Sequence, residues 1–138
     1  MIKTIELEFS TNGEGDTQNI TENVGESIEK SGAKEGYALL FLMSTTSSVA
    51  IIEWEEGLIE DLQTVMNGIA PKNGAYEHEK AWHDGNGHSH MRASILGASL
   101  SIPINKGRMT LGTWQQIILV EFDVRPRRRK LVVQVHGE

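Results

Sequence analysis

The first third of the chain shows hydrophobic patterns of two different periods. Apolar and polar residues alternate over residues 5–9, which predicts a half-buried strand because successive strand side chains point to opposite faces. A polar, glycine-containing stretch over residues 11–18 predicts a loop. Thr21 is then expected to cap a short helix with one apolar face, and Gly32 is expected to end it.

Two strands and the clearest helix signal come next. The run 37–43 is continuously apolar, as expected for a strand covered on both faces. A turn of serine and threonine over 44–48 separates it from a second strand, 49–54. Between residues 58 and 69, apolar side chains recur at spacings of three and four, which predicts an amphipathic helix that Pro71 ends.

A polar segment over residues 71–87 interrupts this regular patterning. It predicts a long loop, and a loop of this length inside a compact domain is more often functional than decorative. A short helix is expected from about His90 to Leu96, with Gly97 ending it.

The C-terminal part of the chain is patterned as strands. We expect them at 100–104, 109–111, 113–122 and 131–136, with a turn at 105–107. Pro103 cannot donate to a strand ladder, so its strand should lie at an edge or contain a bulge. The elements together predict an α+β fold: one domain over residues 1–138, with a mostly antiparallel, sandwich-like sheet and two or three helices.

Composition narrows the class of protein. The chain has 138 residues, 38% of them hydrophobic, which is enough for one core. It contains no cysteine, no apolar run near the roughly 20 residues of a membrane helix, and no signal-peptide pattern at its start. These features favour a cytoplasmic protein that does not enter a membrane.

The charge argues against nucleic acid as a partner. The net charge is −6, whereas general nucleic-acid binding needs a basic surface. One dense basic cluster exists: Arg125, Arg127, Arg128, Arg129 and Lys130. We interpret it as a solvated loop between two strands in preference to a binding patch, because no aromatic residue is interleaved with it.

Four of the five histidines lie between positions 78 and 90: His78, His83, His88 and His90. In an extended segment His88 and His90 would point to the same side, whereas in a helix they would point in nearly opposite directions. A metal site using both therefore predicts an extended segment or a turn. With His78 or His83, they would give three nitrogen ligands and leave a position open, as in catalytic zinc sites. Asp84 is expected either to ligate the metal or to orient a histidine.

Two other interpretations use the same segment. If a helix begins near His90, its free N–H groups form an anion site, to which Arg92 and Ser94 would add donors for a phosphate. Alternatively, the histidines are ordinary hydrogen-bonded surface residues.

Candidates for the remaining chemistry lie outside the histidine segment. Glu53, at the end of an apolar strand, is a candidate general acid or base, or else an exposed residue at a strand end. Thr45 and Thr46 offer hydroxyl groups in a turn. In the segment Leu111–Gln116, Trp114 and Gln115 would lie on opposite strand faces, as a stacking surface and a hydrogen-bonding amide, or as a core tryptophan beside an exposed glutamine.

Several motifs resemble one known family in sequence and in order. They are Thr45-Thr46 before the strand that ends in Glu53, the segment 56–62, Tyr76-Glu-His78, the box Asp84–Gly97, the segment Gly107–Gln115, Glu121-Phe-Asp123 and the terminal Gln134–Gly137. With these motifs the chain resembles the YjbQ-like family, an uncharacterised protein family also called "secondary thiamine-phosphate synthase". The resemblance covers almost the whole chain.

The resemblance implies an α+β homotrimer with its histidines in a polar cleft near a subunit interface, where a divalent metal, zinc first of all, or an anion would bind. It implies a phosphorylated small-molecule ligand and transfer chemistry of the thiamine-phosphate synthase type. By analogy Thr45, Thr46, Asn86, Arg92, Thr113, Trp114 and Gln115 would contact the substrate, while Glu53, Asp84 and His88 would act in catalysis. One position departs from the family pattern: Ser44 stands where relatives usually carry a histidine, which favours a non-catalytic binding or assembly protein as the alternative.

Overall fold

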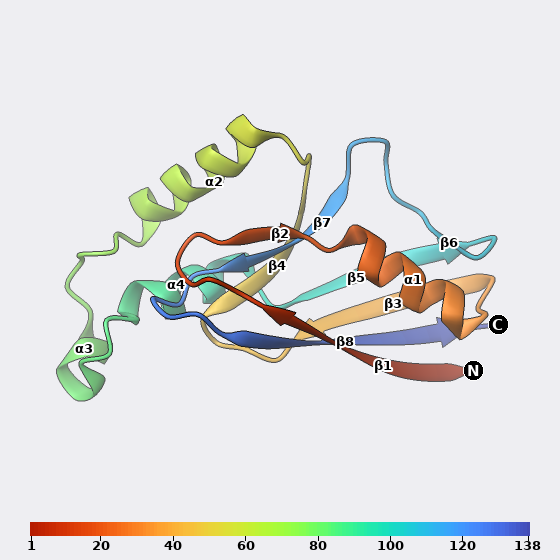
Figure 1. Ribbon diagram of the computed structural model, residues 1–138, viewed down its shortest axis with the longest axis horizontal. Helices are drawn as coiled ribbons and strands as arrows, with labels where there is room; N and C mark the ends of the chain where they lie inside the picture. The colour runs from red at the N-terminus through yellow and green to blue at the C-terminus, as the bar shows by residue number, and fades with distance from the viewer.

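The computed structural model describes residues 1–138 and contains two antiparallel sheets and four helices (Figure 1). The larger sheet has the order β1-β8-β3-β5-β6, with bounds Ile2–Ser10, Arg128–Gly137, Glu35–Leu42, Ser99–Asn105 and Arg108–Met109. The smaller sheet has the order β2-β7-β4, with bounds Thr17–Asn19, Gln116–Glu121 and Ser47–Ile52. The helices are α1 (Thr21–Ser31), α2 (Glu56–Ile69), α3 (Glu77–Trp82) and α4 (Gly87–Leu96). The predicted α+β class is confirmed.

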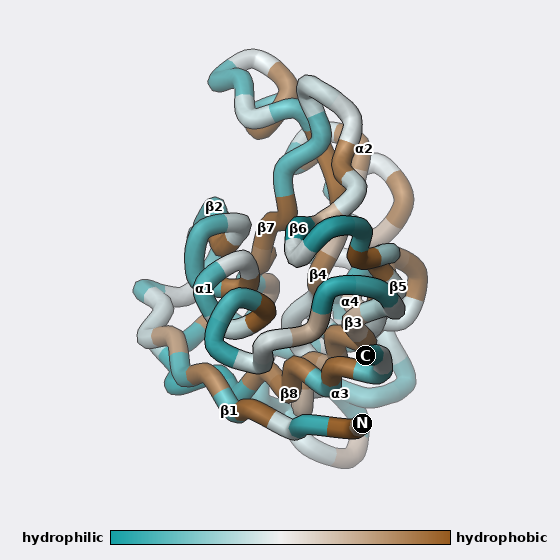
Figure 2. Tube along the Cα trace, turned by 90° about the vertical axis from the view of Figure 1, so that its right-hand side faces the viewer, coloured by the Kyte–Doolittle hydropathy of each residue, from teal (hydrophilic) through white to brown (hydrophobic).

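The main core lies between the larger sheet, helix α1 and one side of the smaller sheet. On β3 and β8, alternate residues such as Leu40 and Val133 face this core and are completely buried. Val24 and Ile28 of α1 cover it. Figure 2 shows the hydrophobic segments running through the strands, whereas most connecting turns are hydrophilic.

A second, smaller core explains why β7 is apolar without alternation. Ile117 and Leu119 face the main core, while Ile118 and Val120 face the other way, toward helices α2 and α4. Met66 of α2 packs there, so β7 is covered on both faces. Polar residues lie at both ends of this doubly covered strand, with Gln115 and Gln116 at its start and Glu121 and Asp123 at its end.

Several expected boundaries are wrong. The segment 71–87 is not a continuous loop, because α3 forms within it and α4 already begins at Gly87. Strand β7 begins at Gln116 and leaves the preceding residues in a turn. Thr21 is the first helical residue and does not cap α1, although Gly32 ends that helix in the left-handed conformation as predicted.

Two further expectations concern the sheet edge and membranes. Pro103 lies just outside the two-residue pairing of β5 with β6, where no neighbouring strand needs its missing N–H. The longest helix, α2, has 14 residues, and none of the helices is long and apolar enough to cross a membrane.

Candidate functional site

Three side chains with metal-binding atoms meet where α3 and α4 approach each other. His78 lies on α3, Asp84 in the connection between the helices, and His90 in the first turns of α4. One ligand atom from each lies within 4.8 Å of the others. Nε2 of His78 is 3.2 Å from Oδ1 of Asp84, and the two imidazole rings are 4.6 Å apart between centroids. We call these three residues the His–Asp trio.

The connection between the two helices is fixed by hydrogen bonds that hold the trio in place. The carboxylate of Glu79 accepts the N–H groups of Gly85 and Gly87, at 2.9 and 2.8 Å. Gly87 is required sterically, because a Cβ atom there would lie 2.6 Å from Cβ of Tyr76. The N–H of Asn86 donates to Asp84, and this bond is the main reason that the pKa of Asp84 is lowered, with His78 contributing in the same direction.

These hydrogen bonds place a carboxylate at the start of α4, where the predicted anion would bind. The carboxylate of Glu79 already occupies that helix terminus. Arg92 points away from it and donates to the carbonyl of Ala70 and the side chain of Asn67, both at 2.9 Å. Ser94 bonds back to the carbonyl of His90 in its own helix. The structure therefore does not bring Arg92 to the histidines, whereas Ser94 lines a hollow together with His78 and His90.

His88 is separated from His90 because the segment is helical, and the expected extended His-x-His pair is wrong. The His88 side chain is 1% exposed, and its Nε2 lies 3.4 Å from Oε1 of Glu14. Burial, reinforced by the positive charge of Arg92, lowers the pKa of His88. Asp84, rather than His88, thus lies with the other two histidines.

A cavity of about 630 Å³ opens beside the trio. Asp84, Asn86 and His90 form one side, and Thr45, Thr46, Arg127 and Arg129 form the other. A second hollow of about 640 Å³ shares Ser44, Thr45 and His90 with it and also contacts His78. The structure therefore brings the predicted residues Thr45, Thr46, Asn86 and Asp84 to one place.

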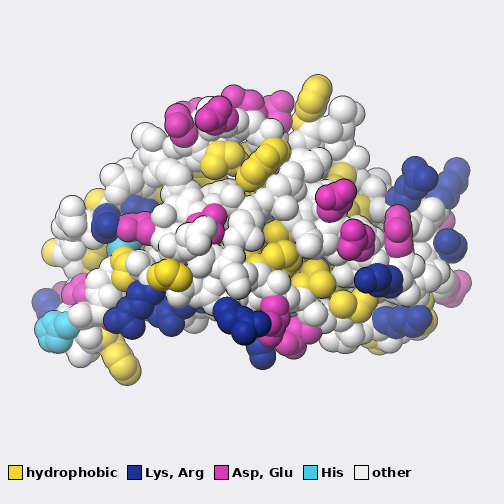
Figure 3. All heavy atoms as spheres, viewed as in Figure 1, with side chains coloured by type: hydrophobic (Ala, Val, Ile, Leu, Met, Phe, Trp, Pro, Cys, Tyr) yellow, Lys and Arg dark blue, Asp and Glu magenta, His cyan; other side chains and the backbone are white.

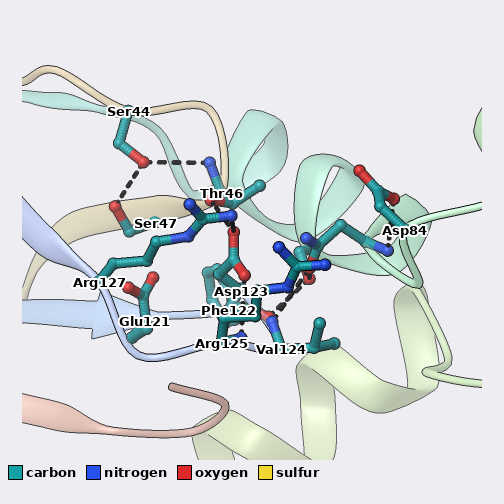
Figure 4. Close-up of polar contacts among 12 residues, drawn as sticks. Ser44, Thr46, Ser47, Asp84, Glu121, Phe122, Asp123, Val124, Arg125 and Arg127 are labelled. Carbon is teal, nitrogen blue, oxygen red and sulfur yellow. Dashed lines mark hydrogen bonds and ion pairs between the residues drawn. The ribbon is translucent and has the colours of Figure 1, made fainter. Parts of the chain in front are cut away.

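The floor of the cavity is a buried network of charges at the end of β7 (Figure 4). Arg129 makes two bonds of 2.8 and 2.6 Å to the carboxylate of Glu121, which is completely buried, and a third of 2.7 Å to Thr46. The Thr46 hydroxyl donates to Asp123 at 2.9 Å. Arg127 pairs with the same carboxylate at 3.1 Å. Every member of the network has a partner, as buried charges require.

Asp123 remains charged in this network. Burial alone would raise the pKa of its carboxyl group, but three donors outweigh it: the N–H of Arg125, the Thr46 hydroxyl and the Arg127 guanidinium. The pKa of Asp123 is therefore lowered. Asn86 ties the same loop to α4, since its Oδ1 accepts the N–H of Val124 and the Ser89 hydroxyl.

The basic cluster is thus not one solvated loop. Arg129 is buried against Glu121, and Arg127 lines the cavity. Arg128 and Lys130 lie on β8 and pair across to Glu8 and Glu6 of β1. Figure 3 shows basic side chains next to acidic ones over much of the visible face.

The other predicted site residues lie at the opposite end of the smaller sheet. Glu53 follows the last residue of β4 and is exposed. Because Ile52 pairs with Gln116, Thr113, Trp114 and Gln115 lie beyond the same end, in an exposed turn. Strand β4 from Ser47 to Ile52 separates them from the cavity by roughly 17 Å at about 3.3 Å per residue. Within one chain, these four residues do not contribute to the cavity.

Sequence reasoning missed Glu121, Asp123, Arg127 and Arg129 as site residues. One signal was present: Glu121 ends an otherwise apolar strand, and a carboxylate there needs a buried partner. Nothing in the sequence pattern showed that the partner would come from β8. The contact of Glu14 with His88 was equally unmarked, since it joins residues 74 positions apart.

Comparison with known proteins gives the family. A family model described as "UPF0047 protein YjbQ-like" matches residues 5–138. A UPF0047 protein of Methanothermobacter thermautotrophicus is 36% identical over 137 residues, which cover 99% of this chain and 94% of the relative. One of Archaeoglobus fulgidus is 34% identical over 130 residues, covering 94% and 98%. The crystal structure of a YbjQ-like protein of unknown function from Sulfolobus solfataricus superposes with a TM-score of 0.93 at 32% identity, covering 100% of this chain and 99% of that one. The chain therefore belongs to the UPF0047 YjbQ-like family.

Proposed function

We propose that the His–Asp trio binds a divalent transition metal, with zinc as the first choice. The supporting observation is the gathering of two imidazoles and one carboxylate within 4.8 Å. Two histidines with one carboxylate are a donor set of catalytic zinc sites, and they leave a position open for water or substrate. The same set also suits iron(II), so the identity of the metal is decided by measurement.

The proposed ligand of the protein is a phosphorylated small molecule. A volume of about 630 Å³ lies in the range of small-molecule sites, and His90 and Asp84 line it directly. When bound, the metal would polarise phosphoryl oxygens and offset negative charge on a leaving group. For thiamine-phosphate synthase chemistry, the thiazole nitrogen would form a bond to the methylene carbon of the pyrimidine. The bond between that carbon and the diphosphate oxygen would break, and diphosphate would leave.

We further propose a homotrimer in which the exposed end of one subunit completes the cavity of the next. Phe41, Met43 and Met91 line the two hollows yet are each about half exposed, and Trp114 is 70% exposed. Exposed apolar groups around a site favour an interface. Because Trp114 lies at the end of the small sheet far from the two hollows, joining it to a neighbour's hollow makes a head-to-tail contact, and such contacts form a ring when the rotation between subunits closes. Glu53 and residues 113–115 would then reach a neighbour's cavity.

A second candidate is a binding or assembly protein without efficient catalysis. Ser44 favours it, because the hydroxyl lines both hollows at the position where relatives usually carry a histidine. The Ser44→His variant separates the two candidates. A large gain in turnover with the two thiamine precursors indicates an enzyme that has lost a group, whereas unchanged turnover favours binding or another reaction.

The metal site is tested by loading the purified protein with Co²⁺. A tetrahedral site gives an intense blue absorption band, and elemental analysis gives the stoichiometry. We expect His78→Ala, His90→Ala and Asp84→Asn each to weaken binding strongly. The matched control is His83→Asn, which keeps a residue tolerant of the left-handed conformation at φ 50° in the same connection. Binding that survives loss of both His78 and His90 would refute the site.

The shared cavity is tested with mixed trimers. Protein carrying His90→Ala is combined with protein carrying Trp114→Ala, after dissociation and reassembly. If cavities form between subunits, some sites in the mixture contain neither substitution, and ligand binding returns in part. A monomer by light scattering at micromolar concentration, or no recovery in the mixture, would count against the shared site.

A further inference from the structure

One cationic side chain of the cavity has donors to spare. Arg129 is 10% exposed and is committed to Glu121 and Thr46. The Arg127 side chain is 42% exposed, and its one ion pair, to Asp123, uses a single nitrogen of the guanidinium. A guanidinium carries five N–H donors, so most of those on Arg127 remain available. Figure 4 shows this side chain reaching Asp123 beside Thr46.

Arg127 is also held at the right place by its backbone. Its carbonyl accepts the N–H of Thr11 at 2.8 Å, and its N–H donates to the Thr11 hydroxyl at 3.1 Å. Because the main chain is fixed on both sides, only the side chain is free to adjust to a ligand. Because the main chain is already ordered, binding costs only the conformational entropy of the side chain.

The turn after β3 adds neutral donors on the same side of the cavity. The Ser44 oxygen accepts the N–H of Thr46 and the hydroxyl of Ser47, which leaves its own proton free to donate. The hydroxyl and the N–H of Thr45 make no hydrogen bond within the chain. Ser44, Thr45 and Arg127 all line the cavity that also contacts His90 and Asp84.

The charge balance makes anion binding at this place dependent on a cation. Around the cavity, the carboxylates of Asp84, Asp123 and Glu121 face two guanidinium groups, those of Arg127 and Arg129. The three carboxylates outnumber the two guanidinium groups, so these side chains together are negative and repel a dianion. A divalent ion on the trio would reverse the sign of this charge.

We infer that Arg127, with the hydroxyl groups of Ser44 and Thr45, forms an oxyanion subsite that receives the phosphoryl group of the ligand only after the metal has bound. This inference rests on the proposed metal site and goes beyond it, because it assigns the residue that selects a phosphorylated ligand and the order of binding. Arg127 binds the anion across the cavity from the metal. The coupling is reciprocal, so a bound anion also tightens metal binding by the same factor.

The test measures the affinity of methylphosphonate for the Co²⁺-loaded and metal-free protein by calorimetry, with the Co²⁺ absorption band as a second signal. Wild-type protein should bind methylphosphonate at least about tenfold more tightly with Co²⁺ than without it. Arg127→Gln should weaken that binding by about tenfold or more, as expected for loss of a charge-assisted bond, and leave Co²⁺ affinity in the absence of phosphonate unchanged. Arg125→Gln is the matched control, because this neighbouring arginine is exposed and lines no cavity.

The outcomes separate the two proposals. Equal phosphonate affinity in Arg127→Gln and wild type, or equal affinity with and without Co²⁺, would overturn the subsite while an intact Co²⁺ band leaves the metal site standing. Failure of wild-type protein to bind Co²⁺ would refute the metal site and, with it, the proposed order of binding. If Arg127→Gln loses the Co²⁺ band, phosphonate affinity is measured on Arg127→Lys instead. This variant keeps a positive charge beside Asp123 but lacks the planar guanidinium group. An affinity for phosphonate like that of wild type in this variant would overturn the role of the guanidinium.

Discussion

The two ends of the smaller sheet differ in how deeply their polar residues are buried. At one end, Glu121, Asp123 and Thr46 are buried and satisfied by arginines that arrive from β8 and its preceding loop. At the other end, Glu53 and Trp114 are exposed. The same strands, β4 and β7, run between them. The difference teaches that a polar residue at a strand end acquires a structural role only when another part of the chain covers it.

The largest expected effect comes from breaking the buried ion pair. Arg129→Met leaves the Glu121 carboxylate buried without its partner and should lower the free energy of unfolding by about 3–5 kcal/mol. Urea denaturation at neutral pH measures this loss. The control at the other end, Glu53→Gln, should change it by less than about 0.5 kcal/mol.

A double variant sharpens the interpretation of that loss. Glu121→Leu combined with Arg129→Met removes both charges, so much of the lost stability should return. If Arg129→Met lowers the free energy of unfolding by less than about 1 kcal/mol, the buried ion pair does not stabilise its end of the sheet more than the exposed Glu53 stabilises the other end.

The second expected effect concerns the connection that holds the trio. Glu79→Ala removes the acceptor for the N–H groups of Gly85 and Gly87, which should cost about 1–2 kcal/mol of stability and weaken Co²⁺ binding by about tenfold. Thermal unfolding and Co²⁺ titration measure the two losses. Glu77→Ala on the same helix is the matched control, because that side chain is 87% exposed and pairs only with Lys80. Equal effects of the two substitutions would contradict a positioning role for Glu79.

A third effect is a pH dependence of folding stability that arises from the buried side chain of His88. Burial lowers the pKa of His88, so the folded state favours the neutral imidazole and the unfolded state binds the proton more readily. This contribution to stability is present above the ordinary histidine value of about 6.5 and is lost as the pH falls below it. Denaturation at several pH values should therefore show a steeper loss for wild type than for His88→Gln. Identical slopes would show that His88 does not titrate differently on folding.

The smallest effect on stability is expected at the exposed end. Trp114→Ala should change the free energy of unfolding of the subunit by less than about 0.5 kcal/mol, because the side chain is 70% exposed. The same substitution should reduce assembly, since an exposed tryptophan is a typical interface anchor. Sedimentation measures the assembled fraction. A large loss of stability together with unchanged assembly would show that Trp114 serves its own subunit.

The sequence predicted elements well where local physics decided them. The apolar run around β3 and the regular spacing of α2 predicted both elements within a few residues. The expected cover on both faces of β3 is wrong, because Tyr37 and Phe41 on its outer face are about half exposed. The sequence did not predict the elements that depend on side-chain contacts rather than on the hydrophobic pattern. Residues 77–82 form a helix despite a polar sequence without apolar periodicity, and the Glu79 carboxylate on this helix binds the start of α4.

The candidate site was only partly predictable for the same reason. The crowding of histidines indicated a segment in which two histidines and one aspartate do gather, but whether His88 or Asp84 joins His78 and His90 depends on where α4 begins. Starting the helix at Gly87 rotates His88 into the interior. A shift of three residues in a helix boundary, too small for pattern analysis to resolve, therefore changed which side chains gather around His78 and His90.

By itself, the sequence determined the α+β class, the antiparallel strands, the family motifs and the segment from Asp84 to His90 as a centre of polar chemistry. These depend on the period of apolar residues and on residue type, which are local properties of the chain. Only the tertiary structure decided that Arg127 and Arg129 meet Thr46 and Asp123, and that Glu53 and Trp114 lie at the opposite end of the smaller sheet within one subunit. Contacts of this kind join strands far apart in sequence, and their positions follow from sheet register and helix packing.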